Sequence, residues 1–162
     1  MKNYTSTVPA ERSVSDIEDL LVRAGAKSIS KEYANNEVSA LNFVIKNPET
    51  ELHIGVRLPA NQDAVFQVLK KGRSPRARPA RGWEQRLREQ SRRTAWKLMY
   101  DWCAVQLSLI EMKQAEMLQV FLPYVWSGQQ SFYEHIKASK FDALTLEYKP
   151  KGSEEASDAD NA

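Results

Sequence analysis

The stretch EVSALNFVIKNPETELHIGVRL, residues 37–58, indicates a β-sheet. Its first half places Leu41, Phe43 and Ile45 at alternate positions, and its second half alternates hydrophobic residues with polar residues or glycine. A period of two puts one set of side chains on a buried face and the other set in water. The run NPET between the halves is typical of a turn. The stretch therefore predicts two antiparallel strands.

A third strand is expected just before this pair, over residues 27–33, where Ile29 and Tyr33 share a face. The dipeptide Asn35-Asn36 then provides a turn, because asparagine tolerates positive φ better than most residues. Two short connections in succession predict a three-stranded antiparallel meander.

A helix is expected ahead of the sheet. Ser15-Asp16-Ile17-Glu18 fits a capping box, and hydrophobic residues recur on one helical face until Gly25. Residues 1–12 show no periodicity and are expected to form a flexible lead-in.

The second half of the chain is predicted to be mainly helical. A short helix is expected between Asn61 and Gly72, and a long one over about residues 83–111. Further helical turns are expected up to Pro123, followed by a short helix that a second capping box opens at Ser131. An extended piece is expected last, with Phe141, Leu144 and Leu146 packing on the core. The whole pattern predicts one α+β domain over residues 13–148, followed by a disordered acidic tail over 149–162.

Composition excludes several classes of protein. The hydrophobic fraction of 42% and the charged fraction of 27% are those of a globular chain. Hydrophobic runs are too short for a membrane span, and the first residues lack the hydrophobic stretch of a secretory signal. The single cysteine, Cys103, allows no intramolecular disulfide. We expect a cytoplasmic protein that does not contact a membrane.

Basic residues are concentrated in the middle of the chain, although the net charge of the whole protein is only +2. Residues 70–97 contain eleven basic residues and two acids, a charge of +9, whereas the rest of the chain carries −7. The eleven are Lys70, Lys71, Arg73, Arg76, Arg78, Arg81, Arg86, Arg88, Arg92, Arg93 and Lys97. Such asymmetry within one chain indicates a strongly anionic partner.

The central hypothesis is binding to nucleic acid. Residues 72–82 are expected to form an exposed loop, because prolines and glycines interrupt them and alanine is their only hydrophobic residue type. The arginines of this loop would contact phosphates flexibly, and the cations that follow would form a fixed row on the long helix. No groove-reading motif is evident, so the sequence predicts a non-enzymatic, sequence-tolerant accessory protein, with DNA and RNA both open.

Three alternatives use the same region. The basic surface could dock on an acidic protein, for example to inhibit a host factor. It could also be a merely solvated face, in which the spacings Glu84–Arg88 and Glu89–Arg93 give ordinary ion pairs. Separately, the long helix could form a homodimer through a partly exposed hydrophobic stripe. That stripe includes Leu98, Trp102, Val105 and Leu109.

Trp96 is the tryptophan expected to lie off this hydrophobic stripe, beside Arg92 and Arg93. Aromatic side chains stack on unpaired bases without sequence preference, so Trp96 is a candidate stacking platform. Trp83 and Trp102 fall on the stripe and are expected in the core.

No catalytic or metal site is predicted. Cys103 has no histidine near it in sequence, and His53 and His135 lack metal-ligand spacing to other histidines, cysteines or carboxylates. We therefore expect neither an enzyme nor a cofactor.

Several short motifs together resemble a known family. They are Leu58-Pro59-Ala60-Asn61, Ala64-Val65, Val68-Leu69, Ala95-Trp96, Asp101-Trp102, Gln106-Leu107, Val120-Phe121-Leu122-Pro123-Tyr124 and Tyr133-Glu134. Over about residues 13–146 the chain resembles small uncharacterised proteins encoded by bacteriophages, prophages and other bacterial mobile elements. The resemblance implies a bacterial host cell and dealings with DNA or host defences. It implies no mechanism and no catalytic residue.

Overall fold

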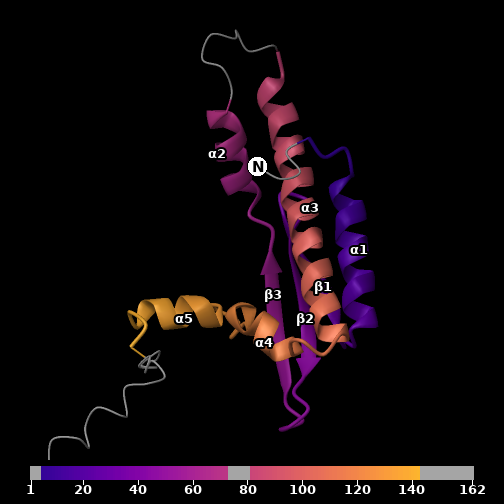
Figure 1. The fold of residues 1–162 in the computed structure, drawn as a ribbon. Coiled ribbons are helices and arrows are strands. Elements are labelled where there is room, and N and C mark those ends of the chain that lie inside the picture. Colours follow the sequence, from indigo (N-terminus) through magenta and orange to yellow (C-terminus); the bar gives the residue numbers. More distant parts are fainter. Residues whose placement is uncertain (1–4, 73–80, 143–162) are drawn as a thin grey trace, which may run out of the picture.

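A computed structural model describes residues 5–72 and 81–142 of the 162-residue chain. The elements in chain order are α1 (Ala10–Arg23), β1 (Ile29–Ala34), β2 (Glu37–Lys46), β3 (His53–Pro59), α2 (Gln62–Lys71), α3 (Trp83–Glu111), α4 (Met117–Phe121), the 3-10 helix η1 (Leu122–Tyr124) and α5 (Phe132–Ala138) (Figure 1). The strands form one antiparallel sheet in the order β1-β2-β3. The predicted α+β class, with an N-terminal helix, a three-stranded meander and one long helix, is confirmed.

The strand register gathers hydrophobic side chains on one face of the sheet. Phe43 on β2 pairs with Val56 on β3, and their neighbours Leu41 and Leu58 pair likewise. All four side chains are almost completely buried. The predicted turn at Asn35-Asn36 is present, and both asparagines have positive φ, 53° and 64°.

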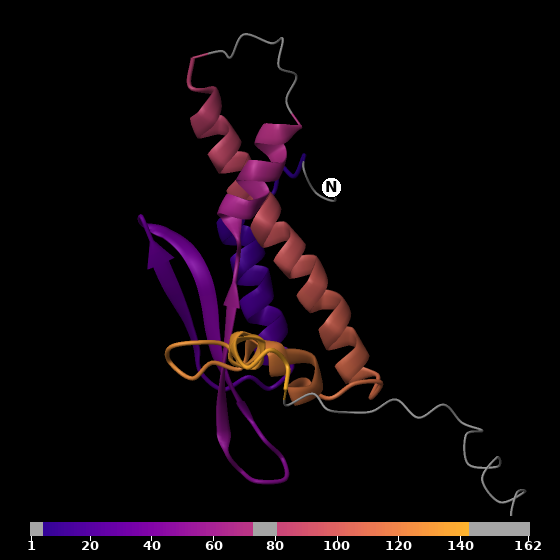
Figure 2. The same cartoon turned by 90° about the vertical axis from the view of Figure 1, so that its left-hand side faces the viewer.

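Helices α1 and α3 lie side by side and cover this face of the sheet (Figures 1 and 2). Ile17 and Leu21 from α1 join Trp96 and Cys103 from α3 in the same hydrophobic cluster as the strand residues. At the opposite end of the core from α2, Phe121 of α4 packs edge-to-face on Phe43, with ring centroids 5.2 Å apart. The helices therefore cover one face of the sheet. On the other face, Ser30 is exposed, and Asn42 and Arg57 remain partly accessible.

The first helix begins earlier than predicted. It starts at Ala10 with Pro9 as its N-cap, so the Ser15 box lies inside the helix and caps nothing. The reason is that the buried stripe begins before the box, at Ala10 and Val14, and continues the helical period into Ile17. Residues 10–12 thus belong to α1 and not to a lead-in.

The C-terminal part follows the prediction as far as α5. Ser131 caps this helix, and the capping box with Glu134 is formed as predicted. Phe141, however, lies in a turn and is 42% exposed, so it does not pack into the core as expected. Leu144, Leu146 and the predicted acidic tail lie outside the described residues.

Candidate nucleic-acid interface

The central basic segment spans the hairpin formed by α2 and α3. Asn61 opens α2 directly after β3, since its side-chain oxygen accepts a hydrogen bond of 3.0 Å from the Ala64 backbone N–H. Phe66 is the buried residue of α2, and the Arg88 guanidinium of α3 lies 4.3 Å from its ring centroid. The end of α2 and the start of α3 project together beyond the sheet (Figures 1 and 2).

Four cations occupy this projecting end, and we call them the basic tip. Lys70 and Lys71 form the last turn of α2, Arg81 precedes the α3 N-cap, and Arg86 lies in the first turns of α3. All four are exposed. Within residues 5–72 and 81–142, none of them forms an ion pair with an acidic side chain.

The predicted loop arginines connect the two halves of this tip in sequence. Arg73, Arg76 and Arg78 lie outside the described residues. From Lys70 to Gly82 the sequence contains six cations and no acid, so the charge of Lys70, Lys71 and Arg81 is not offset by neighbours in this stretch.

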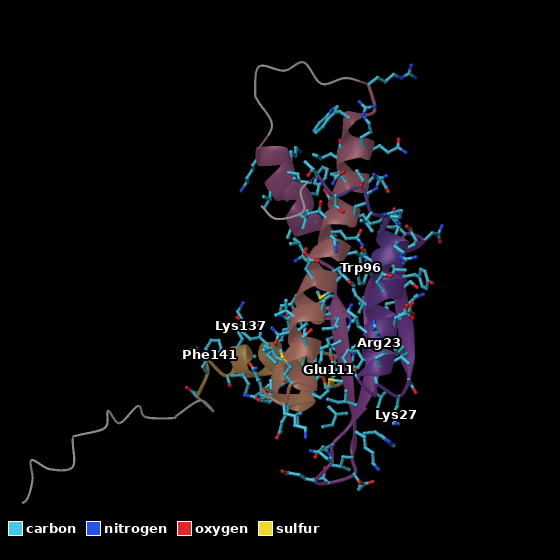
Figure 3. The ribbon with its side chains drawn as sticks, turned by 45° about the vertical axis from the view of Figure 1, so that its right-hand side comes forward. Arg23, Lys27, Trp96, Glu111, Lys137 and Phe141 are labelled. Atoms are coloured by element: carbon cyan, nitrogen blue, oxygen red, sulfur yellow. The ribbon has the colours of Figure 1, made fainter. Side chains whose placement is uncertain are left out.

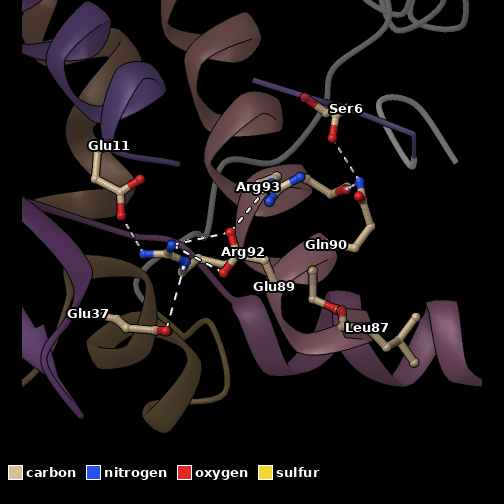
Figure 4. Close-up of polar contacts among 10 residues, drawn as sticks. Ser6, Glu11, Glu37, Leu87, Glu89, Gln90, Arg92 and Arg93 are labelled. Atoms are coloured by element: carbon tan, nitrogen blue, oxygen red, sulfur yellow. Dashed lines mark hydrogen bonds and ion pairs between the residues drawn. The ribbon is translucent and has the colours of Figure 1, made fainter. Parts of the chain in front are cut away.

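Arg92 has a different environment from the tip. Its side chain is only 16% exposed, and its guanidinium forms ion pairs with Glu11 of α1, Glu89 of α3 and, at 3.9 Å, Glu37 of β2 (Figure 4). Burial opposes the charged form, but the hydrogen bonds that Arg92 donates to Glu89 and Glu11 outweigh it and raise the Arg92 pKa. The Glu11 pKa is lowered by a backbone hydrogen bond and by Arg92. Arg92 thus joins three elements of the fold and is not available to a ligand.

Three other cations of the predicted row, Arg88, Arg93 and Lys97, are also paired, whereas Arg86, the first cation of that row, belongs to the basic tip. Arg93 Nε lies 3.1 Å from Glu89, and Lys97 Nζ lies 2.9 Å from Asp101. Both pairs have i,i+4 spacing, as does the 3.4 Å contact of Arg88 with Glu84. The pairs of Glu84 and Glu89 are those that the sequence spacing suggested.

Acids from distant parts of the sequence complete this pairing. Asp63 of α2 approaches Arg88 to 3.7 Å, and Glu37 and Glu89 line a hollow of about 630 Å³ together with Arg86, Arg88 and Arg93. The row on α3 is therefore a surface of mixed charge, which Arg86 adjoins, whereas Lys70, Lys71 and Arg81 lie away from this hollow. Sequence alone gave no signal for Glu11, Glu37 or Asp63, because each arrives from another element.

The prediction that Trp96 stacks on bases is wrong. Trp96 is fully buried, and its indole N–H donates a hydrogen bond of 3.1 Å to the Val38 carbonyl oxygen. Figure 3 shows it on the part of α3 that α1 and the sheet cover. The buried face of α3 is rotated relative to the predicted hydrophobic stripe: Val105 is 60% exposed, whereas Cys103 and Leu107 are buried. Trp102 is half-buried against Phe121, as expected of a core residue.

A second polar cluster on the accessible face of the sheet had not been anticipated. Arg57 donates two hydrogen bonds from Nε and one from Nη2 to the Glu32 carboxylate, at 2.8–3.1 Å, and Asn42 donates a fourth. The Arg57 guanidinium also lies 4.9 Å from the Trp126 ring centroid. The only indication of this cluster in the sequence was the alternation that places Arg57 on the polar face of β3.

The described residues offer little to other kinds of site. No three or more of their His, Cys, Asp and Glu side chains are grouped to hold a metal ion. Cys103 is buried, and burial raises the pKa of its thiol to about 12. None of the described helices has the length and hydrophobicity needed to cross a membrane.

Comparison with known proteins adds no family to this description: no protein-family model, curated protein or solved structure matches the chain.

Proposed function

We propose that the protein binds nucleic acid without catalysis and without sequence preference, through the basic tip at the end of the α2–α3 hairpin. The observation that carries this proposal is the contrast along one segment. Cations of the row on α3 are paired with the protein's own acids, whereas Lys70, Lys71, Arg81 and Arg86 face solvent without such partners among the described residues.

Uncompensated cations favour a phosphate backbone as ligand. Each Lys or Arg that neutralises a phosphate releases condensed counterions, and this term dominates non-specific affinity. The tip and the sequence between its halves together supply seven cations, Lys70, Lys71, Arg73, Arg76, Arg78, Arg81 and Arg86. We expect Kd values of about 1–100 μM at physiological salt, which is the usual range for non-specific binding.

This proposal is narrower than the one drawn from the sequence. The phosphate-binding role is retained for the tip. It is dropped for the buried Trp96 and for the paired cations Arg88, Arg92, Arg93 and Lys97. The phage or mobile-element setting remains a prediction from the resemblance, and DNA and RNA both remain candidates.

The test is fluorescence anisotropy with labelled single-stranded DNA, double-stranded DNA and RNA of mixed sequence. We expect the Lys70→Ala/Lys71→Ala protein to lose affinity by roughly 30-fold at 0.15 M salt, since each phosphate contact contributes about fivefold there. Lys137→Ala/Lys140→Ala makes the same change of charge on exposed residues at the other end of the molecule and should bind as the wild type does.

Absence of binding at low salt, by protein that circular dichroism shows to be folded, would reject the proposal. The tip would then be assigned to an acidic protein partner, and pull-downs with wild type and the Lys70→Ala/Lys71→Ala protein would be the next experiment. The homodimer through α3 is a separate prediction, which light scattering over a range of concentrations tests.

A further inference from the structure

A second candidate site lies on the accessible face of the sheet, at the opposite end of the molecule from the basic tip. A pocket of about 330 Å³ forms where β3, η1 and the start of α5 meet. Its lining includes Pro59, Pro123, Tyr124, Trp126, Tyr133 and Glu134. The volume is at the lower end of the range for ligand sites, about 300–1,000 Å³. Three aromatic rings and two prolines give it flat, apolar walls.

Trp126 forms a fixed wall of this pocket. Its backbone N–H donates a hydrogen bond of 2.9 Å to the Gly55 carbonyl oxygen on β3. Its ring packs against the Arg57 guanidinium at 4.9 Å, and Arg57 is itself held by Glu32. A wall that is already ordered reduces the entropy lost when a ligand binds.

The two tyrosines complete the apolar surface. Tyr124 packs on Trp102 of α3, with ring centroids 5.4 Å apart, so it is tied to the core. Tyr133 lies in the first turn of α5 and is 51% exposed. Its ring lies beside that of Phe141, with centroids 6.3 Å apart. Tyr133 is therefore an exposed aromatic ring beside a rigid aromatic wall.

Glu134 supplies the polar group of the pocket. The Ser131 backbone N–H and hydroxyl both donate to Oε2, at 2.7 and 2.9 Å. No described residue donates a hydrogen bond to Oε1. Hydrogen bonds from Ser131 lower the Glu134 pKa, so the carboxylate is ionised at neutral pH. Arg57, the cation of the lining, forms its ion pair with Glu32 and acts on Glu134 only through a weaker coulombic interaction. The pocket thus presents an anionic oxygen to a ligand.

We propose that this pocket binds an extended, proline-containing peptide of a partner protein, with an arginine or lysine of that peptide pairing with Glu134. Aromatic-lined grooves accept proline because the polyproline II helix is preformed and its rings pack flat on aromatic faces. Nucleic acid is the wrong ligand here, because the Glu134 carboxylate would repel phosphate. The site is independent of the basic tip, so either can fail without affecting the other.

The experiment is a selection from two libraries of synthetic dodecapeptides. One has two prolines at fixed positions three residues apart and random residues elsewhere, and the other contains no proline. We expect enrichment from the first library alone, with arginine or lysine over-represented beside the prolines. The best peptide is then measured by calorimetry against the wild type and three variants.

Tyr133→Ala should weaken this peptide at least about tenfold by removing an aromatic wall. Glu134→Gln keeps the helix cap, because glutamine also accepts the Ser131 hydrogen bonds, and should abolish the preference for a basic residue. Tyr33→Ala removes another exposed tyrosine, 65% exposed on β1, and should change nothing.

Three results would overturn the proposal. They are no enrichment of proline peptides, equal binding by the Tyr133→Ala protein, and displacement of the peptide by single-stranded nucleic acid at the wild-type tip affinity. Circular dichroism of each variant ensures that lost binding is not lost folding.

Discussion

Trp96 of α3 and Val38 of β2 join the long helix to the central strand, because the indole N–H donates a hydrogen bond of 3.1 Å to the Val38 carbonyl oxygen. The same carbonyl accepts a second hydrogen bond, of 2.9 Å, from the Gln62 side chain at the start of α2. One backbone group of the sheet therefore positions both helices of the basic hairpin.

Replacing Trp96 should destabilise the fold without touching the surface. Trp96→Phe removes one hydrogen bond and part of a buried ring, and we expect a loss of about 1–3 kcal/mol in the free energy of unfolding. Val105→Ala, on the exposed side of the same helix, should lower the free energy of unfolding by less than about 0.5 kcal/mol, apart from the difference in helix propensity between the two residues. Urea denaturation measures both. Similar losses in the two proteins would contradict the observed orientation of α3.

Arg92 should act as a structural residue. Arg92→Met keeps most of the side-chain length but leaves Glu11 without its cation and Glu89 with Arg93 alone, and we expect a loss of about 1–3 kcal/mol in the free energy of unfolding. This is less than for a fully buried pair, because Glu11 is 63% exposed and regains water.

Arg93→Met is the matched control for Arg92. Its side chain is twice as exposed, 34% against 16%, and within residues 5–72 and 81–142 it pairs only with Glu89, so its loss should stay below about 1 kcal/mol. If the two variants unfold at the same urea concentration, Arg92 does not join α1, β2 and α3 as described.

The Arg57–Glu32 contact should make stability depend on acid pH. Hydrogen bonding by Arg57 lowers the Glu32 pKa below its ordinary value of 4.5. A carboxyl whose pKa is lower in the folded state stabilises the fold above its unfolded pKa, and this contribution disappears as the pH falls through the folded pKa. The urea concentration at the unfolding midpoint should therefore fall as the pH is lowered below about 4.5. The Glu32→Gln protein should show a smaller fall. If its pH profile is the same as that of the wild type, Glu32 does not have this role.

Cys103 should be unreactive in the native protein. Burial raises its thiol pKa to about 12, so the thiolate is scarce at pH 8 and a reagent cannot reach it. Ellman's reagent should modify the thiol only as fast as the protein opens, and immediately in urea. Rapid modification of the folded protein would show that α3 is not packed against the core at this point.

The fold was predictable because its main signals are local. Alternation around Phe43 and Val56 placed the sheet, the asparagine pair placed its first turn, and the Ser131 capping box placed α5. The start of α1 was missed because a capping box at Ser15 looked stronger than Pro9, yet burial of Ala10 decided the boundary. Packing outside the local sequence overrode capping there.

The candidate site was only half predictable for the same reason. Pairs at i,i+4, such as Lys97 with Asp101, can be read from spacing. Partners from other elements, such as Glu11 for Arg92, cannot. Trp96 was misplaced because α3 is covered by α1 and the sheet together, so its buried face is wider than a single stripe.

We expect the basic tip, and not the row on α3, to bind phosphate. The most direct measurement is the slope of log K against log salt concentration for a nucleic acid that the wild type binds. Three proteins are compared: the wild type, a tip variant with Lys70, Lys71, Arg81 and Arg86 all changed to Ala, and the row variant Arg93→Ala/Lys97→Ala.

Seven phosphate contacts give a wild-type slope of about −6 on double-stranded DNA. We expect the tip variant to flatten this slope by about 3.6 and the row variant to change it by less than about 1. If the row variant flattens the slope by about 2 and the tip variant leaves it unchanged, the phosphates are bound by the row on α3 and not by the tip.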